Sequence, residues 1–531
     1  MIARKVVVLG LDAADFTLID PWRKAGDLPV MDRLLRAGAS GPLRSTDPPV
    51  SSPAWATFMT GLDPGSHGLY DFVIEDPRTL RPLLARHDLI RGKRIWDVVG
   101  AAGRRTAVVN LPITWPPPSF PGAMVTGMLT PAKTDRFTHP PDLGERVRKA
   151  IPGYLCDLDV RLKSDPVRMR AHLDDLAKMN ADAMRLLARE TPWDLFVGIF
   201  TTTDRAQHLF WPERQAVVRD HYRLVDRLLG DVLADVGPDP LVILLSDHGF
   251  HGIRVKFYFN RWLQERGWLA TRPRATAGAG VPSPDDSDVE RGEGFFASPK
   301  SRGGLLRRMF AQGKEQDLEV DREKSRAWLY SVWTGGIRVN LKGRSPNGTV
   351  EPGAEYERFR DEIIEGLRSL RFPGEDRPLF DFVGRAEEMY RGDMLSWAPD
   401  VVTRSDGFLV EPGKNLQKGK TIRVTEHDRG SHSDTGILGM VGPGIQPGAR
   451  VEGAKLVDVF PTVLWAMGIE LPAGLDGKPL TAAFAPEAVA ANPVRIATGP
   501  SAATSAAEDA AAMTSAEEEE LRKTLEGLGY L

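Results

Sequence analysis

Hydrophobic and polar positions along the chain divide it into short apolar runs and longer stretches with helical spacing. Runs of five or six mostly apolar residues are typical of strands buried on both faces of a parallel sheet. Between them, apolar residues recur every three or four positions and predict helices, most clearly at 53–60, 166–189 and 215–236. Strands that alternate with helices predict an α/β fold with a largely parallel sheet. The strand-like runs lie at residues 6–11, 106–111, 195–200, 241–245 and 437–441.

The pattern changes after about residue 266. Residues 271–304 are rich in Arg, Gly, Ser, Pro and acids, which is typical of a mobile loop. Residues 327–341 alternate like a pair of strands broken at Gly335-Gly336, and 355–370 predict an amphipathic helix. We therefore expect a smaller, cap-like α+β unit at 267–396.

This inserted unit would divide the main α/β domain into two parts, 1–266 and 397–489. The chain is expected to rejoin the main domain at Pro399-Asp400-Val401-Val402. Residues 490–531 are predicted to form an Ala-rich linker followed by a short acidic helix.

Length and composition narrow the class of protein. The chain has 531 residues, more than a single core usually supports, and its 42% hydrophobic content is ample for globular packing. A formal net charge of -3 argues against a scaffold that binds nucleic acid through phosphate contacts. The single cysteine, Cys156, excludes an intrachain disulfide, fits a reducing compartment and is expected to be a packing residue.

The sequence predicts neither a membrane span nor a cleaved signal. The apolar residues at 6–11 are too few for a signal sequence and are expected to form the first strand. No stretch approaches the roughly 18 consecutive apolar residues of a membrane span. We therefore expect a cytoplasmic protein without membrane contact.

The acid and histidine at 247–248 carry the clearest chemistry. Asp247-His248 follows the apolar run at 241–245 after one intervening residue, Ser246, and precedes Gly249. Polar residues at the carboxyl end of a parallel strand commonly face a ligand, and carboxylate and imidazole are both zinc ligands. Taken alone, the aspartate could instead cap the turn and the histidine could be a core residue.

Four further residues stand where the fold would place them at the same end of the sheet. Asp12 ends the first strand, and His432 lies in a Gly-flanked loop just before the strand at 437–441. Asp204 and His208 follow the strand at 195–200, and their i, i+4 spacing puts both on one face of a helical turn. The sequence therefore predicts a metal site, although each residue alone also has an ordinary structural explanation.

Two adjacent serines precede a predicted helix. Ser52 followed by Pro53 fits an N-cap with proline at the first helical position. Helix capping leaves Ser51 unexplained. A serine beside the amino end of a helix lies where an anionic substrate is favoured, and a divalent ion can lower its hydroxyl pKa. Ser51 is therefore the candidate nucleophile.

The order of these residues resembles the metal and nucleophile motifs of the alkaline phosphatase superfamily. The stretch Thr60-Gly61-Leu62-Asp63-Pro64-Gly65-Ser66-His67-Gly68 is similar to the Thr-Gly-x-x-Pro-x-x-His-Gly signature of its type I phosphodiesterase/nucleotide pyrophosphatase branch. The resemblance spans residues 12–432. It implies the three-layer sandwich of that superfamily, with a mainly parallel central sheet.

The resemblance also implies two divalent metal ions, with zinc expected and manganese as the alternative. It implies a hydrolase of small phosphate esters, of the phosphodiester or nucleotide pyrophosphate type, with a phosphoseryl intermediate on Ser51. Two ions roughly 3.5–4 Å apart can stabilise both the attacking and the leaving oxygen of phosphoryl transfer. One ion would be held by Asp204, His208 and His432, and the other by Asp12, Ser51, Asp247 and His248.

Other activities stay open at this point. A cofactor-independent phosphomutase or a phosphomonoesterase would use the same ligand order. The mutases usually carry a cap between the nucleophile and the Asp-x-x-x-His motif, whereas the insertion here follows Asp247-His248. A sulfatase is disfavoured because Trp55 stands where the Cys/Ser-x-Pro-x-Arg motif has arginine. A non-catalytic binding protein is disfavoured because all seven candidate positions carry competent residues.

The groups that would bind phosphate outside the metal ligands are not evident. The phosphodiesterase branch commonly has an asparagine soon after the nucleophile, where this chain has Ala54, Trp55 and Ala56. Arg338 and Arg429 are candidates for phosphate contact.

Three further histidines have less defined roles. His67 lies in a Pro-Gly-Ser turn and is expected to be structural. His251 and His427 are expected to support the metal ligands or to contact substrate.

Overall fold

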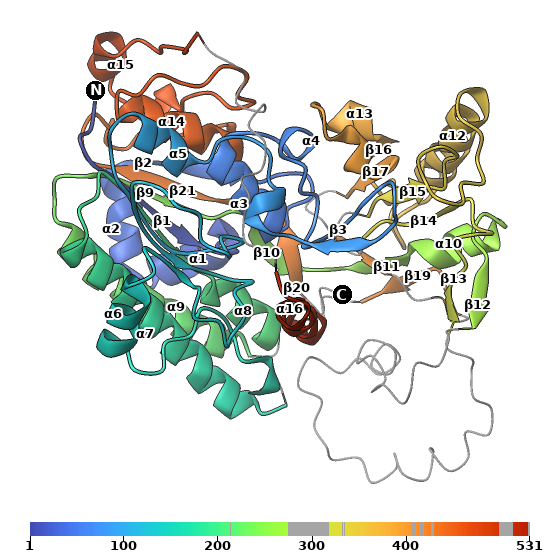
Figure 1. Cartoon of the computed structure of the whole chain (residues 1–531), viewed down its shortest axis with the longest axis horizontal. Coiled ribbons are helices and arrows are strands. Elements are labelled where there is room, and N and C mark those ends of the chain that lie inside the picture. The colour runs from blue at the N-terminus through green and yellow to red at the C-terminus, as the bar shows by residue number, and fades with distance from the viewer. Residues whose placement is uncertain are drawn as a thin grey trace.

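A nine-stranded sheet forms the centre of the larger part of the molecule (Figure 1). The computed structural model describes residues 1–162, 164–212, 214–273, 318–331, 333, 335–405, 409–413, 416, 419–425, 430–498 and 513–528. The strands lie in the order β22 (Ala454–Lys455), β2 (Ala39–Arg44), β21 (Thr435–Val441), β9 (Leu241–Leu245), β1 (Val6–Leu11), β8 (Leu195–Phe200), β5 (Thr106–Leu111), β6 (Gly122–Thr126) and β7 (Thr138–His139).

The central strands are parallel, which confirms the predicted fold class. β1 pairs in parallel with both β8 and β9, and β5 pairs in parallel with β8 and β6. β21 runs antiparallel between β9 and β2. All five predicted strands are present, and only β21 begins earlier than its apolar run, at Thr435.

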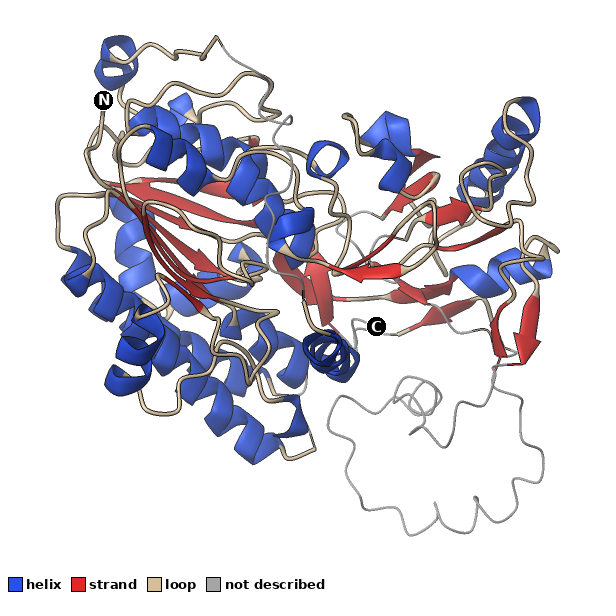
Figure 2. Ribbon diagram, in the orientation of Figure 1, coloured by secondary structure: helices blue, strands red, loops and turns tan. Residues whose placement is uncertain are grey.

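Helices cover both faces of this sheet, so that the larger part is a three-layer sandwich (Figure 2). Successive residues of β1 point to opposite faces, with Val6 and Val8 in one apolar core and Val7 and Leu9 in the other. One layer contains α3 (Ser51–Thr60), α5 (Ile95–Ala101) and α14 (Val459–Ala466), and α4 (Pro64–His67) packs beside α3. The opposite layer contains α1 (Phe16–Lys24), α2 (Pro29–Ala37), α6 (Leu143–Ala150), α7 (Pro166–Glu190), α8 (Thr202–Phe210) and α9 (Gln215–Val236).

A smaller unit with its own apolar core lies beside the sandwich (Figure 1). One of its sheets contains β14 (Ala327–Leu329), β15 (Ile337–Val339), β17 (Val401–Arg404) and β16 (Phe382–Arg385), and another contains β18 (Val410–Gly413), β11 (Val255–Tyr258) and β19 (Ile422–Val424). A third pairs β12 (Thr271–Pro273) with β13 (Leu318–Val320). Its helices are α10 (Phe259–Glu265), α12 (Ala354–Arg368) and α13 (Ala386–Met389).

Two further strand pairs and two further α-helices are described, besides short 3-10 helices. The pair β10 (Gly249–Gly252) and β20 (Gly430–Ser433) lies next to β21 of the main sheet, and β3 (Val73–Glu75) pairs with β4 (Pro82–Leu84). α15 (Pro486–Ala491) and α16 (Ser515–Leu528) lie near the end of the chain.

The predicted elements of the smaller unit are present, but the expected point of return differs. The strand pair and the helix predicted at 327–341 and 355–370 correspond to β14, β15 and α12. The run at 399–402, however, contributes to β17, which pairs with β15 and β16 rather than with the main sheet. The chain returns to the main sheet only at β21. An apolar run predicts a strand without specifying its partner, which explains the difference.

The smaller unit also begins earlier than residue 267. Apolar residues of β11 and α10, including Val255 and Trp262, belong to its core. The predicted loop at 271–304 begins with β12, and its residues after Pro273 lie outside the described part of the chain.

The predicted helix near the carboxyl end is α16. Leu521 and Leu525 are buried and join the core of the α3 layer, and Glu517 forms an ion pair with Arg136 at 2.8 Å. Residues 499–512 of the preceding Ala-rich linker lie outside the described part of the chain. Among the described residues, no helix combines the length and apolar character needed to cross a membrane.

Candidate active site

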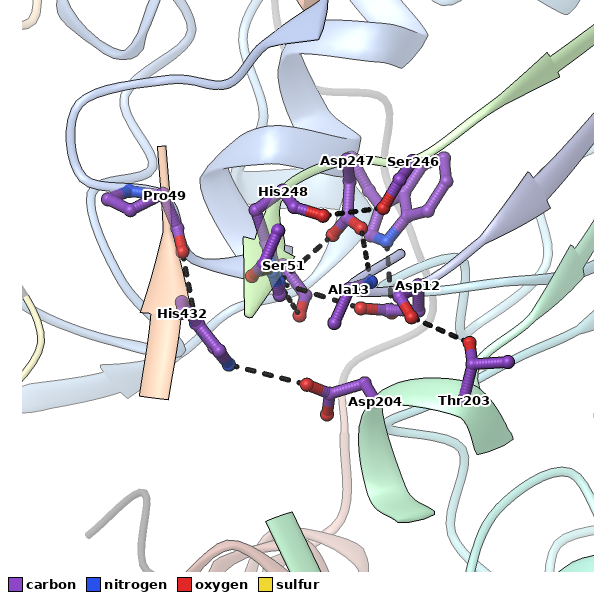
Figure 3. A network of polar contacts seen from close by, with 12 residues as sticks. Asp12, Ala13, Pro49, Ser51, Thr203, Asp204, Ser246, Asp247, His248 and His432 are labelled. Carbon is purple, nitrogen blue, oxygen red and sulfur yellow. Dashed lines mark hydrogen bonds and ion pairs between the residues drawn. The ribbon is translucent and has the colours of Figure 1, made fainter. Parts of the chain in front are cut away.

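The candidate residues come together beside one end of the main sheet (Figure 3). Asp12 directly follows β1, and Asp247-His248 follows β9. Asp204 lies in the first turn of α8, just after β8. These are the carboxyl ends of three adjacent parallel strands, the edge at which open α/β sheets bind ligands. His432 reaches the same place from β20.

Ser51 is the first residue of α3, and its hydroxyl oxygen lies 3.2 Å from Nε2 of His248. The predicted N-cap role of Ser52 is wrong, because Val50 is the N-cap residue and the Ser52 hydroxyl donates to the Asp71 carbonyl at 3.0 Å. Proline is tolerated throughout the first turn of a helix, so Pro53 did not fix the starting residue. Of the two serines, it is therefore Ser51 whose hydroxyl faces His248.

The first ligand group consists of Asp12, Asp247 and His248, all fully or almost fully buried. His248 Nε2 lies 3.5 Å from Oδ1 of Asp12 and 3.4 Å from Oδ2 of Asp247. The Ser51 hydroxyl approaches the same nitrogen atom. The oxygen atoms of two carboxylates and one hydroxyl thus gather around Nε2 of His248.

The second ligand group consists of Asp204, His208 and His432. Oδ1 of Asp204 lies 3.2 Å from Nε2 of His208 and 3.5 Å from Nε2 of His432. The two Nε2 atoms are 2.9 Å apart. The His208 side chain retains 21% of its exposure, whereas those of the other two retain 3%. Solvent therefore reaches this group from the side of His208.

The two groups are neighbours. The imidazole rings of His248 and His432 stack with their centroids 3.9 Å apart and their planes 25° apart. Each ring belongs to a different group, so cations bound by the two groups would share one small site. That arrangement matches two-metal centres that act on a single phosphoryl group.

Hydrogen bonds fix which imidazole nitrogen faces the centre. Nδ1 of His248 lies 3.0 Å from the Gly249 carbonyl, and Nδ1 of His432 lies 3.0 Å from the Pro49 carbonyl. A carbonyl oxygen can only accept, so both Nδ1 atoms donate and a neutral ring presents the lone pair of Nε2. Protein ligands to metals are commonly oriented in this way.

The donor set fits divalent cations. Three buried carboxylate oxygens, Oδ1 of Asp12, Oδ1 of Asp204 and Oδ2 of Asp247, have no hydrogen-bond partner in the described part of the chain. Each lies within 3.5 Å of an Nε2 atom. Buried acceptors that face other acceptors are costly unless a cation lies between them. Carboxylate and imidazole are the ligands that zinc and manganese accept.

The pKa shifts of the site residues also fit a pair of cation-binding groups. Burial and the charge of Asp247 raise the pKa of Asp12 well above its ordinary value, and burial together with Asp204 raises the pKa of Asp247. Burial, followed by the neighbouring His248, lowers the pKa of His432 to about 3. His432 is therefore neutral at physiological pH, as a metal ligand must be.

Trp55 has a role that the sequence did not reveal. Its indole Nε1 donates to Oδ2 of Asp12 at 3.3 Å, which leaves Oδ1 directed toward His248. The ring fits because Gly10 lies beneath it, and a Cβ atom at Gly10 would lie 2.7 Å from the indole. The tryptophan that replaces the sulfatase arginine at position 55 thus orients Asp12, a candidate metal ligand.

His67 is enclosed within the fold, in agreement with a structural role. Its Nδ1 accepts from the Leu69 amide at 3.2 Å, so its Nε2 donates to the Thr57 hydroxyl at 3.0 Å. The side chain is fully buried, and burial lowers the pKa of His67 from 6.5 to about 3.

We expect His67 to make folding sensitive to acid. Below pH 6.5 the unfolded chain binds a proton that folded His67 excludes, so stability is lost as the pH falls from 6.5 toward 3. From pH 7 to pH 5 the loss is about 2 kcal/mol for one such histidine. His67→Gln should reduce the difference between urea unfolding free energies at these two pH values by about this amount. An unchanged difference would contradict this assignment.

The four residues predicted to support the metal ligands or to contact phosphate differ in their outcome. His251 is partly buried on β10, and its Nδ1 lies 3.0 Å from the Gly252 carbonyl. Arg338 is fully buried and donates to the carbonyl oxygens of Ser396 and Trp397 at 3.2 and 2.9 Å, contacts that hold the smaller unit together. A phosphate contact from Arg338 is therefore not supported. His427 and Arg429 lie outside the described residues.

Cys156 is partly buried and packs against the core of the α7 and α9 layer. Its environment agrees with the predicted packing role. Burial raises the pKa of its thiol to about 12, which keeps it uncharged at physiological pH.

Two aromatic residues beside the second ligand group were not predicted. The ring of Phe250 meets His208 edge to face at 4.9 Å, and Trp333 stacks on His432 at 4.9 Å. Trp333 belongs to the smaller unit, more than 80 residues from His208 and His432 in sequence. Pairing between such distant residues has no local sequence signal.

Comparison with known families places the chain among phosphoester hydrolases. Residues 6–379 match the family model of type I phosphodiesterase/nucleotide pyrophosphatase. The match includes Ser51 and all the candidate ligands except His432, which lies beyond it. A search of curated proteins found no match.

Solved structures share the fold at low sequence identity. Phosphonoacetate hydrolase from Sinorhizobium meliloti 1021, in complex with phosphonoformate, has a TM-score of 0.53 at 15% identity, over 88% of this chain and 96% of its own. The murine ectonucleotide pyrophosphatase/phosphodiesterase 5, an inactive variant in complex with AMP, has a TM-score of 0.50 at 13% identity, over 88% and 95% of the two chains.

The fold and the family match define a phosphoester hydrolase with an alkaline-phosphatase-like α/β architecture. The chain belongs to the type I phosphodiesterase/nucleotide pyrophosphatase family. The family resemblance and the fold class predicted from the sequence are thereby confirmed.

Proposed function

We propose that this protein hydrolyses phosphodiesters or nucleotide pyrophosphates through a phosphoseryl intermediate on Ser51, with two divalent metal ions. Zinc is the expected metal, with manganese as the alternative. The observation that carries the proposal is the stacking of His248 on His432, since it joins two ligand groups into one site beside the Ser51 hydroxyl. In this proposal Asp12, Asp247, His248 and Ser51 hold one ion, and Asp204, His208 and His432 hold the other.

The protein's own residues would orient and activate the nucleophile. Ser51 begins α3, where the first backbone N–H groups have no partner within the helix and favour an anionic phosphoryl group. Trp55 and the Gly249 carbonyl orient Asp12 and His248 around the Ser51 hydroxyl. The bound ions would supply the positive charge that lowers the pKa of the Ser51 hydroxyl and neutralises the phosphoryl oxygens.

Two displacements would complete the reaction. The Ser51 oxygen forms a bond to phosphorus while the bond from phosphorus to the leaving alcohol or phosphate breaks. In the second displacement, the oxygen of a water molecule forms a bond to phosphorus while the bond from phosphorus to the Ser51 oxygen breaks. A proton from that water restores the Ser51 hydroxyl. The low exposure of this site limits competing reactions, and the exposed edge of His208 is the side from which substrate and water would enter.

The proposal is tested by metal content and substrate preference of the purified full-length protein. We expect about two divalent ions per chain and faster hydrolysis of bis-p-nitrophenyl phosphate than of p-nitrophenyl phosphate or p-nitrophenyl sulfate. Preference for the monoester would favour the phosphomonoesterase alternative, and preference for the sulfate would favour a sulfatase. Protein that binds no divalent ion and hydrolyses none of the three would overturn the proposed mechanism.

A further inference from the structure

The connection between β14 and β15 brings the smaller unit into contact with the second ligand group. Trp333 lies on this connection, and its ring stacks on His432 with centroids 4.9 Å apart and planes 21° apart. The same ring meets His208 edge to face at 6.1 Å. A residue of the smaller unit therefore touches two of the three candidate ligands of one metal ion.

His432 lies between two rings. His248 stacks on it at 3.9 Å, and two rings cannot occupy the same face of one imidazole, so Trp333 covers the opposite face. The hydrogen bond from Nδ1 of His432 to the Pro49 carbonyl fixes one edge of the ring. This single bond still allows the ring to tilt about it. The two stacking partners restrict that tilt and thus the direction of Nε2.

A short chain of hydrogen bonds ties Trp333 to the helix that begins with Ser51. The Trp333 amide donates to the Ser331 hydroxyl at 3.0 Å, and that hydroxyl donates to the buried carboxylate of Asp71. The Asp71 carbonyl accepts from the hydroxyl of Ser52 at 3.0 Å. The main domain thus holds the β14–β15 connection at two points, Trp333 through His432 and Ser331 through Asp71.

We propose that Trp333, anchored by Ser331 and Asp71, is a positioning residue that orients His432 for metal binding. The smaller unit then completes one of the two ligand groups. This inference rests on the proposed two-metal function. Contacts that orient metal ligands typically change metal affinity or activity about 10- to 100-fold when they are removed. We expect an effect of that size at the group of Asp204, His208 and His432.

The test compares metal binding by metal-free, full-length variants in zinc titration calorimetry. Trp333→Ala should weaken one class of zinc site about 10- to 100-fold and leave the other unchanged. Trp333→Leu fills much of the same volume without a ring, so it should resemble the alanine variant and protect the fold. Trp333→Phe restores a ring and should recover most of the affinity. Turnover at limiting zinc should follow the same order.

Two further variants separate positioning from general damage. Ser331→Ala removes the anchor and should weaken the same class of zinc site by a smaller factor. Trp268→Ala is the matched control, because Trp268 is also a partly buried tryptophan of the smaller unit and packs against Trp262 and Phe359. It should lower stability without altering zinc affinity.

The outcomes distinguish this inference from the proposed function. Wild-type protein that binds no zinc or manganese would refute the two-metal function itself. Wild-type protein with two zinc sites that keep full affinity in both Trp333→Ala and Trp333→Leu would overturn only the role of Trp333. Equal weakening in Trp268→Ala, or no recovery in Trp333→Phe, would also overturn it.

Discussion

Ser51→Ala is expected to abolish turnover while the protein stays folded and keeps most of its metal. Removal of the attacking oxygen prevents the first displacement, and loss of the nucleophile in a serine enzyme can cost on the order of 10⁶-fold in kcat. The remaining ligands, two carboxylates and one imidazole in the first group, are unchanged by this substitution. Hydrolysis of bis-p-nitrophenyl phosphate, measured together with metal content, checks both parts of the prediction.

Ser52→Ala is the matched control for this experiment. Ser52 is equally buried and adjacent in sequence, but its hydroxyl donates to the Asp71 carbonyl instead of facing His248. Its loss should cost about 1 kcal/mol of stability, the typical contribution of one hydrogen bond, and should lower turnover far less than Ser51→Ala does. Near-normal turnover in Ser51→Ala combined with inactivity of Ser52→Ala would show that the other serine is the nucleophile.

Asp247→Asn is expected to inactivate the enzyme and at the same time stabilise the metal-free protein. The amide is a poorer ligand, so the first group should lose its ion and turnover should fall about 100-fold or more. Without metal, Asp247 is a fully buried carboxylate beside Asp12 and Asp204, and its replacement removes that repulsion. We expect a gain of about 1–3 kcal/mol in the free energy of unfolding at pH 7.5 with chelator present.

The sign of the pH dependence follows from the raised pKa values of Asp12 and Asp247. In the metal-free protein these groups bind protons more tightly when folded than when unfolded, so stability falls as the pH rises from about 3.8 through the raised values. Asp247→Asn removes one of these groups and should reduce that fall. Without metal the Asp247→Asn variant should be more stable than the wild-type protein. With zinc present the wild-type protein should be the more stable of the two, because it gains more stability from bound metal than the variant does. Urea unfolding at two pH values, with zinc or with chelator, measures each of these differences.

Asp226→Asn provides the control for a buried carboxylate outside the site. Asp226 is also fully buried, but it accepts hydrogen bonds from the amides of Val30 and Met31 in the first turn of α2, at 3.0 and 2.8 Å. An amide can replace only one of these acceptors, so stability should fall by about 1 kcal/mol while turnover is unchanged. A destabilised Asp247→Asn in the presence of chelator would contradict the repulsion described above.

Much of the fold could be predicted because its central strands are buried on both faces. Such strands appear as continuous apolar runs, and β1, β5, β8 and β9 have the bounds that those runs suggest. The boundaries of the smaller unit were less predictable. The run at 399–402 predicted a strand but not its sheet, and only the pairing of β17 with β15 and β16 assigns it to the smaller unit.

The candidate site was predictable to the extent that its residues follow strands. Asp12 directly follows β1 and Asp247 lies two residues after the end of β9, and parallel pairing of those strands brings the two carboxylates together. The supporting contacts had no comparable signal. Trp55 and Trp333 are ordinary apolar residues in sequence, and their contacts with Asp12 and His432 depend on how α3 and the smaller unit pack.

The sequence by itself determined the α/β class, the family resemblance and the residue types that could bind metal, because these depend on local periodicity and on the order of short motifs. The tertiary structure decided that the acids and histidines form two adjacent groups, that Ser51 rather than Ser52 faces them, and that the smaller unit contacts one group through Trp333. Most of these features arise from contacts between segments that lie far apart in the sequence. Such contacts are set by the packing of whole layers, which no local pattern records.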